Sequence, residues 1–141
     1  MNLKWAAVAV VVALLGYAIW QRHAERVEAA ELARLTDDNG FVELAQPSGA
    51  DPRKVWIVAA ANCPKEGARR ADALASDLAE RDVVFERRSN VSFSFEANDP
   101  VLFRRIDAML GGETPIVFVN ARIKANPALD DVLAEYRAAQ R

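Results

Sequence analysis

The fold is decided by residues 55–64, which read VWIVAAANCP. The first seven form a continuous apolar run of strand length, as expected for a strand buried on both faces. Cys63 is the second residue after this run, and Pro64 fits the first position of a helix. A cysteine just before a helix lies near unpaired N–H groups and the positive end of the helix dipole, which favour a thiolate. The stretch therefore predicts a buried strand that brings a redox type of thiol to the start of a helix.

The patterns after Pro64 predict alternating helices and strands. Apolar residues at helical spacing indicate a helix over 64–81, and an apolar run indicates a strand over 83–87. A strand, helix, strand succession with short joints implies a parallel crossover. Further elements are predicted as a short edge strand at 41–44, a helix from Pro100 capped by Asp99, strands at 114–119 and around Ile123, and a last helix begun by Asn126 and Pro127. These elements together define an α/β domain.

Residues 89–95 alternate polar and apolar, which places Val91, Phe93 and Phe95 on one side of an extended segment. The segment is either an additional strand packed on the core or an ordered loop on the surface. A lid near the thiol is the functional alternative. We favour the packed strand, because alternating apolar residues are usually buried.

Composition excludes several classes of function. The 141 residues carry 20 acidic and 18 basic side chains, so no large basic face is offered to nucleic acid. Cys63 is the only cysteine, which excludes an internal disulfide. With His23 as the only histidine, a Cys/His metal site lacks ligands. We expect neither a metal nor a nucleic acid partner.

The amino terminus predicts a membrane anchor. Residues 3–20 are almost uninterrupted Ala, Val, Leu and Ile, long enough for a helix to span a bilayer core, and Trp5, Tyr17 and Trp20 lie toward the ends of the run. The alternative is a secretory signal cleaved near Val27-Glu28-Ala29, which is a poor cleavage site. We predict a single-pass anchor at 1–22, a stalk and linker at 23–52 and one domain at 53–141, with the domain on the extracytoplasmic side.

The order of elements and the motif positions resemble the thioredoxin-like superfamily, and the glutaredoxins within it most closely, from Val55 to Tyr136. Cys63-Pro64-Lys65-Glu66 is similar to the Cys-Pro-Tyr-Cys of glutaredoxins, and Thr114-Pro115 is similar to their Thr-Val-Pro, whose proline is cis. The resemblance implies a central mixed sheet flanked by helices. It also implies a cis Pro115 beside Cys63, with the backbone of Thr114 free to pair with an extended thiol substrate.

This resemblance makes Cys63 the candidate catalytic residue and Pro64, Lys65, Thr114 and Pro115 the candidate substrate-binding residues. Glu66 occupies the place of the second cysteine, so a two-cysteine exchange mechanism is excluded within one chain. The lysine that glutaredoxins place before the cysteine is also missing. The sequence therefore leaves open whether glutathione is a co-substrate. If it is, Lys65 or Lys124 would have to supply the cation that binds its carboxylate. We expect no cofactor.

Two functions follow from these residues. The first is a membrane-anchored protein in which Cys63 exchanges disulfides as a single thiol with a protein partner. The second is a thioredoxin-like binding or assembly module that kept the fold without the chemistry. A third interpretation makes Cys63 an ordinary core residue, since cysteine is among the most buried residue types. Whether the chain is an enzyme stays open at this point, because a fold does not establish a function.

Overall fold

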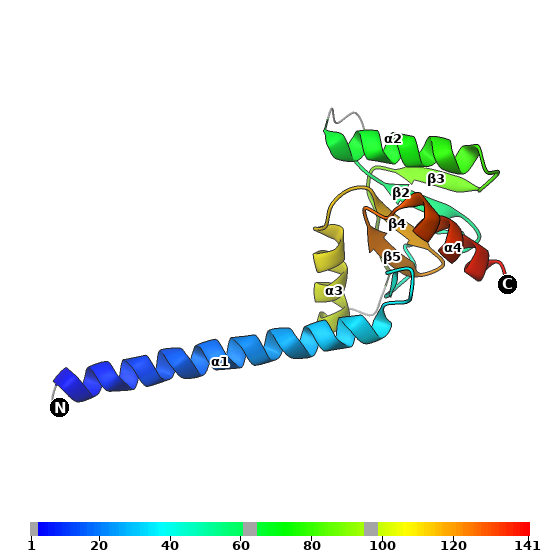
Figure 1. Cartoon of the computed structure of the whole chain (residues 1–141). Coiled ribbons are helices and arrows are strands. Elements are labelled where there is room, and N and C mark those ends of the chain that lie inside the picture. Colours follow the sequence, from blue (N-terminus) through cyan, green and yellow to red (C-terminus); the bar gives the residue numbers. More distant parts are fainter. Residues whose placement is uncertain (1–2, 61–64, 95–98) are drawn as a thin grey trace. The chain divides into compact units, whose positions relative to one another are not determined.

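The computed structural model describes residues 3–60, 65–94 and 99–141, with side chains from residue 8 onward. The chain divides into two compact units, Met1–Leu35 and Thr36–Arg141. The first unit is the helix α1 (Leu3–Leu35) (Figure 1). The expected stalk and linker at 23–52 is divided between the two units, with residues 23–35 in the first and residues 36–52 in the second. Within the described residues, no helix is both long enough and apolar enough to cross a membrane.

The second unit contains a mixed sheet of five strands. Their order is β1 (Val42–Glu43), β5 (Arg122–Ala125), β4 (Ile116–Val119), β2 (Val55–Val58) and β3 (Phe85–Arg88). The pair β2 and β3 is parallel, and every other pair is antiparallel. The helix α2 (Glu66–Ala79) connects the two parallel strands and is the predicted crossover. An α/β domain with a mixed sheet flanked by helices is therefore confirmed.

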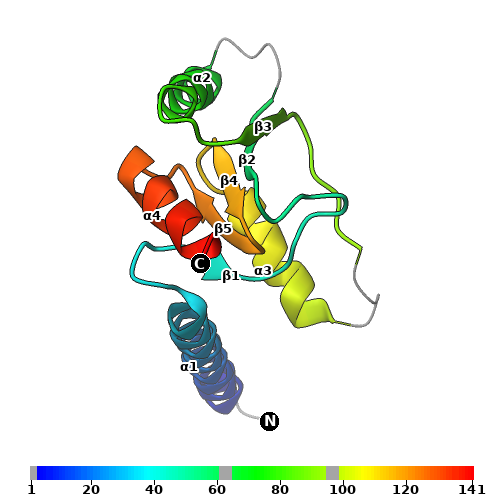
Figure 2. The same cartoon turned by 90° about the vertical axis from the view of Figure 1, so that its right-hand side faces the viewer.

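The two faces of the sheet are covered by different helices, because alternate side chains of a strand point to opposite faces. Val55 and Ile57 lie in the cluster that α2 and α4 (Leu129–Ala139) form on one face. Trp56 and Phe118, which are register partners, are also buried but lie outside that cluster. Figure 2 shows α2 and α4 on one side of the sheet and α3 (Pro100–Leu110) on the other.

The predicted helix starts were right in one case and wrong in two. Asp99 caps α3 as predicted, because its carboxylate accepts the N–H groups of Val101 and Leu102 at 3.1 and 2.9 Å. The helix α2 begins at Glu66 with Lys65 as its N-cap, two residues later than predicted. The last helix begins at Leu129 and not at Pro127.

The late start of α4 has a local cause. Asn126 has a left-handed backbone with φ of 44°, and its N–H donates to the carbonyl of Pro115 at 2.7 Å. Asparagine tolerates this conformation better than most residues. The residue predicted as a helix cap is therefore held in the turn that leaves β5.

Ser89–Ser94 form an ordered loop, so the favoured prediction of a strand was wrong for this part of the segment. The loop is held at Ser92, whose carbonyl accepts the N–H of Ser48 at 2.8 Å. It is also held at Phe93, whose ring lies 5.9 Å from that of Phe118 between centroids. These contacts attach the loop to the sheet face without a ladder of backbone hydrogen bonds. Phe95 lies outside the described residues.

Candidate functional site

The first turns of α2 lie directly against the loop that precedes β4. Arg70 donates to the carbonyl oxygen of Thr114 from Nε at 3.0 Å and from Nη2 at 2.9 Å. One turn earlier, Gly67 is so close to Thr114 that an added Cβ would lie 1.8 Å from its Oγ1. Because any other side chain would fill this space, glycine allows the close approach. The start of α2 and the Thr114 loop are therefore a single packed unit.

Pro115 is fully buried at the entrance to β4. The Thr114–Pro115 peptide bond is cis, as the resemblance implied. The Pro115 carbonyl accepts the N–H of Asn126, so the turn after β5 lies beside the proline. Three segments distant in sequence thus meet here, namely the start of α2, the loop before β4 and the turn after β5.

The structure describes three of the five predicted site residues. Cys63 and Pro64 lie outside the described residues. Lys65 is exposed at the N-cap of α2, Thr114 is half-buried, and Pro115 is buried. Thr114 and Pro115 thus lie beside the helix that Lys65 begins. The resemblance implied a Thr114 backbone free to pair with a substrate, and in the structure its carbonyl accepts two hydrogen bonds from Arg70.

Charged side chains surround Arg70. Its Nη1 lies 3.2 Å from Glu66 Oε1, and its Nη2 lies 3.9 Å from Glu113 Oε2. Glu113 also accepts a hydrogen bond of 3.0 Å from the Asn126 side chain. Both carboxylates are more than two-thirds exposed, and exposed ion pairs contribute at most about 1 kcal/mol. The two bonds to the Thr114 carbonyl therefore fix Arg70 more firmly than its ion pairs do.

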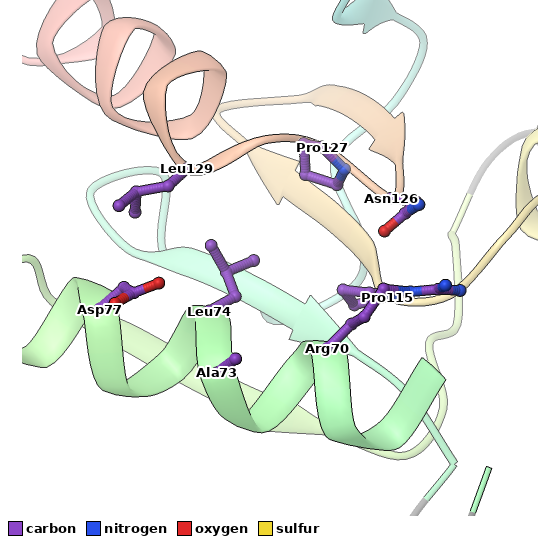
Figure 3. Close-up of a pocket in the computed structure, with 8 residues that line it drawn as sticks. All are labelled: Arg70, Ala73, Leu74, Asp77, Pro115, Asn126, Pro127 and Leu129. Carbon is purple, nitrogen blue, oxygen red and sulfur yellow. The ribbon is translucent and has the colours of Figure 1, made fainter. Parts of the chain in front are cut away.

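A shallow pocket of about 200 Å³ lies beside this contact (Figure 3). Figure 3 shows Leu74 and Asp77 reaching it from α2, and Pro115 and Asn126 bordering it from the opposite side. Its lining is mainly apolar. Lys124, one of the two cations considered for glutathione, does not line it, because its ammonium donates to Asn39 O at 2.6 Å and Asp131 at 2.7 Å.

Sequence reasoning missed part of this site. Arg70 lies one turn after Glu66 and pairs with it, but no pattern in the sequence indicates its hydrogen bonds to Thr114. Gly67 carried a usable signal, because a glycine inside a helical pattern costs stability and often has a packing reason. The contact between Asn126 and Pro115 had no local signal, because it joins two turns that only the folded sheet brings together.

Comparisons with protein-family models, with curated proteins and with solved structures found no match to this chain. Within the described residues, no group of three His, Cys, Asp or Glu side chains could hold a metal ion. The site is therefore characterised by its own geometry, which is a helix start, a proline loop and an arginine that joins them.

Proposed function

We propose that the second unit is a thioredoxin-like domain in which Cys63 exchanges disulfides as a single thiol. The sheet supports the fold, because a central mixed sheet flanked by helices is what the resemblance implies. The observation that carries the proposal is the contact of Gly67 and Arg70 with Thr114. It brings the predicted substrate loop to the helix that follows Cys63 in the sequence.

The proposed exchange needs one thiol of this chain and one from outside. The Cys63 thiolate attacks one sulfur of a partner disulfide, a bond forms between the two sulfurs, and the second partner sulfur leaves as a thiolate. An external thiolate then attacks the mixed disulfide and regenerates the Cys63 thiolate. No second cysteine of this chain takes part, because Glu66 stands in its place.

Some charges at the start of α2 stabilise such a thiolate and others destabilise it. The helix dipole and the cations Lys65 and Arg69 favour negative charge near the first turn. Glu66 opposes it, but Arg70 lies 3.2 Å from that carboxylate and reduces its effect. A thiol pKa below the ordinary cysteine value of about 8.5 is therefore the expected property.

The test is intact-mass measurement of the purified full chain after treatment with glutathione disulfide, together with a pH titration of thiol reactivity. A single mixed disulfide that disappears in Cys63→Ser, with a thiol pKa below about 8.5, would support the exchange. A pKa at or above that value, with no mixed disulfide formed, would refute it.

A non-catalytic binding or assembly module is the second candidate, and the hydrogen bonds of Arg70 favour it. A substrate backbone that pairs with the Thr114 carbonyl must first displace two hydrogen bonds. Arg70→Ala removes both donors, whereas Arg81→Ala removes an exposed arginine just beyond the other end of α2 and serves as the matched control. If exchange with a peptide disulfide is faster in Arg70→Ala than in Arg81→Ala, the carbonyl takes part in substrate binding. Equal rates, together with an unreactive Cys63, would favour the binding module.

Attachment of α1 to a membrane is also proposed, on the sequence of residues 3–20 alone. The proposal places the domain on the extracytoplasmic side of a single-pass anchor. Extraction of cell membranes with alkaline carbonate tests it, because an integral segment stays in the pellet. Full release into the supernatant would refute the anchor.

A further inference from the structure

Glu135 on α4 is a buried acid far from the candidate site in sequence. It is 4% exposed, and its Oε2 accepts a hydrogen bond of 3.4 Å from the Asn39 side chain. Its Oε1 lies 3.6 Å from Arg122 Nε on β5. Asp37 approaches the same two residues, through Arg122 Nη1 at 2.6 Å and the Asn39 N–H at 2.9 Å, which brings the two carboxyl groups together. A buried carboxyl group in contact with another requires an explanation, because burial disfavours the charged form.

Asp37 organises the turn that it begins. Its Oδ1 accepts the N–H groups of Asn39 at 2.9 Å and of Phe41 at 2.8 Å. Its Oδ2 lies 2.6 Å from Arg122 Nη1. Phe41 is fully buried in the core cluster, and β1 begins at the next residue. The Asp37 carboxylate therefore holds the turn, a core side chain and the start of an edge strand in place.

The charges around this pair do not balance when both acids are ionised. Among the described residues, Arg122 is the cation that pairs with both acids, and it is also 3.5 Å from Glu43 on β1. Lys124 on β5 reaches the turn only at the Asn39 carbonyl, and its charge is paired with Asp131 at 2.7 Å. Two neighbouring carboxylates that share one arginine cannot both ionise without a cost, and such a pair titrates as a unit.

We propose that Asp37 and Glu135 share one proton, and that the loss of this proton as the pH rises loosens the turn Asp37–Phe41 from α4. In the protonated state the Glu135 hydroxyl donates to the Asp37 carboxylate. When a base in solution removes the proton, two carboxylates face each other across the same contact. Repulsion then opposes the hydrogen bonds that hold the turn. The chain thus contains a pH-sensitive latch at the start of its second unit.

The directions of the two pKa shifts agree with an arrangement in which two carboxyl groups share one arginine. Burial raises the pKa of Glu135, and the hydrogen bond and charge of Asp37 raise it further. Burial also acts to raise the pKa of Asp37, but hydrogen bonds from Glu135, Phe41, Arg122 and Asn39 together lower it. The raised pKa of Glu135 means that its contribution to stability is lost as the pH rises through its folded value. The lowered pKa of Asp37 means that its contribution is lost as the pH falls through its folded value. The latch is closed between these two values.

The test is an NMR pH titration of the full chain that follows the Glu135 and Asp37 carboxyl carbons and the amides of Asn39 and Phe41. The Glu135 midpoint is expected above the ordinary glutamate value of about 4.3, and the Asn39 and Phe41 amides are expected to shift at the same pH. In Glu135→Gln, which keeps a donor toward Asp37 but cannot titrate, that amide transition should disappear.

Glu43→Gln is the matched control, since it removes an exposed carboxylate from the same arginine and should leave the amide transition in place. A Glu135 midpoint at or below the ordinary value would overturn the proposal. The same amide transition in Glu135→Gln as in the unaltered chain would also overturn it. Should Glu135→Gln not fold, the carboxyl midpoints of the unaltered chain decide alone.

Discussion

Replacing Gly67 with alanine tests whether the start of α2 and the Thr114 loop are packed as tightly as the structure shows. The new Cβ would lie 1.8 Å from Thr114 Oγ1 and 3.0 Å from Thr114 Cβ, whereas ordinary contact begins at 3.4 Å. Rotating the threonine side chain does not relieve the clash at Cβ. The helix start and the loop therefore have to move apart.

Two opposing terms set the size of the effect. Overpacking a well-packed contact costs about 1–3 kcal/mol. Alanine is favoured over glycine inside a helix by about 1 kcal/mol, and by less in a first turn. We therefore expect Gly67→Ala to lower the free energy of unfolding by about 0.5–2 kcal/mol. The result is informative because helix propensity alone predicts the opposite sign.

Urea unfolding of the full chain, followed by circular dichroism, measures this difference. Gly111→Ala is the matched control, because an added Cβ there meets its nearest atom, Asp107 O, at 3.4 Å. Thr114→Ala in the Gly67→Ala background should recover part of the loss, since Oγ1 is removed and only the contact at Cβ stays. Unchanged or raised stability in Gly67→Ala, with no coupling to Thr114→Ala, would refute the close packing.

Four further changes have defined outcomes. Ala121→Gly should raise the free energy of unfolding by about 0.5–1 kcal/mol in urea, because Ala121 has a left-handed φ of 63° that glycine adopts without strain. Asp99→Ala should lower it by about 1 kcal/mol through the lost helix cap, and Asp99→Asn should restore most of that loss. Leu78→Ala should lower it by about 2–5 kcal/mol, because Leu78 is fully buried between α2 and the sheet. Stability should fall as the pH drops through the lowered pKa of Asp37, and Asp37→Asn should flatten this acid limb in unfolding curves measured at several pH values.

The elements that depend on local pattern were predictable from the sequence. Residues 55–58 of the apolar run at 55–61 form a strand that is buried at every position, and Ala71, Leu74 and Leu78 form the buried face of α2, as their spacing predicted. The cap at Asp99 needs only the three residues that follow it, of which Val101 and Leu102 donate their N–H groups. In each case the pattern that predicts the element lies within a short stretch of consecutive residues.

The failures have a common physical cause. Asn126 fits a helix cap and a left-handed turn equally well, and the distant carbonyl of Pro115 decides between them. Residues 89–94 have the alternation of a strand, but their hydrogen bond from Ser48 holds them as a loop. In the same way, the contact between Asp37 and Glu135 joins residues from opposite ends of the second unit. Tertiary contacts determine these conformations, and the local sequence pattern does not reveal such contacts.

Arg70 connects Glu66 with the Thr114 loop. Glu66, which the proposed resemblance puts in the place of a second cysteine, accepts a hydrogen bond from Arg70 Nη1 at 3.2 Å. Nε and Nη2 of the same guanidinium donate to the Thr114 carbonyl. A guanidinium so occupied orders the loop more readily than it binds an incoming anion, because a ligand carboxylate would have to break bonds within the protein. Glu66 and the Thr114 carbonyl are thus held by one guanidinium, so a partner in the proposed exchange would have to displace Arg70 or approach Thr114 without its carbonyl.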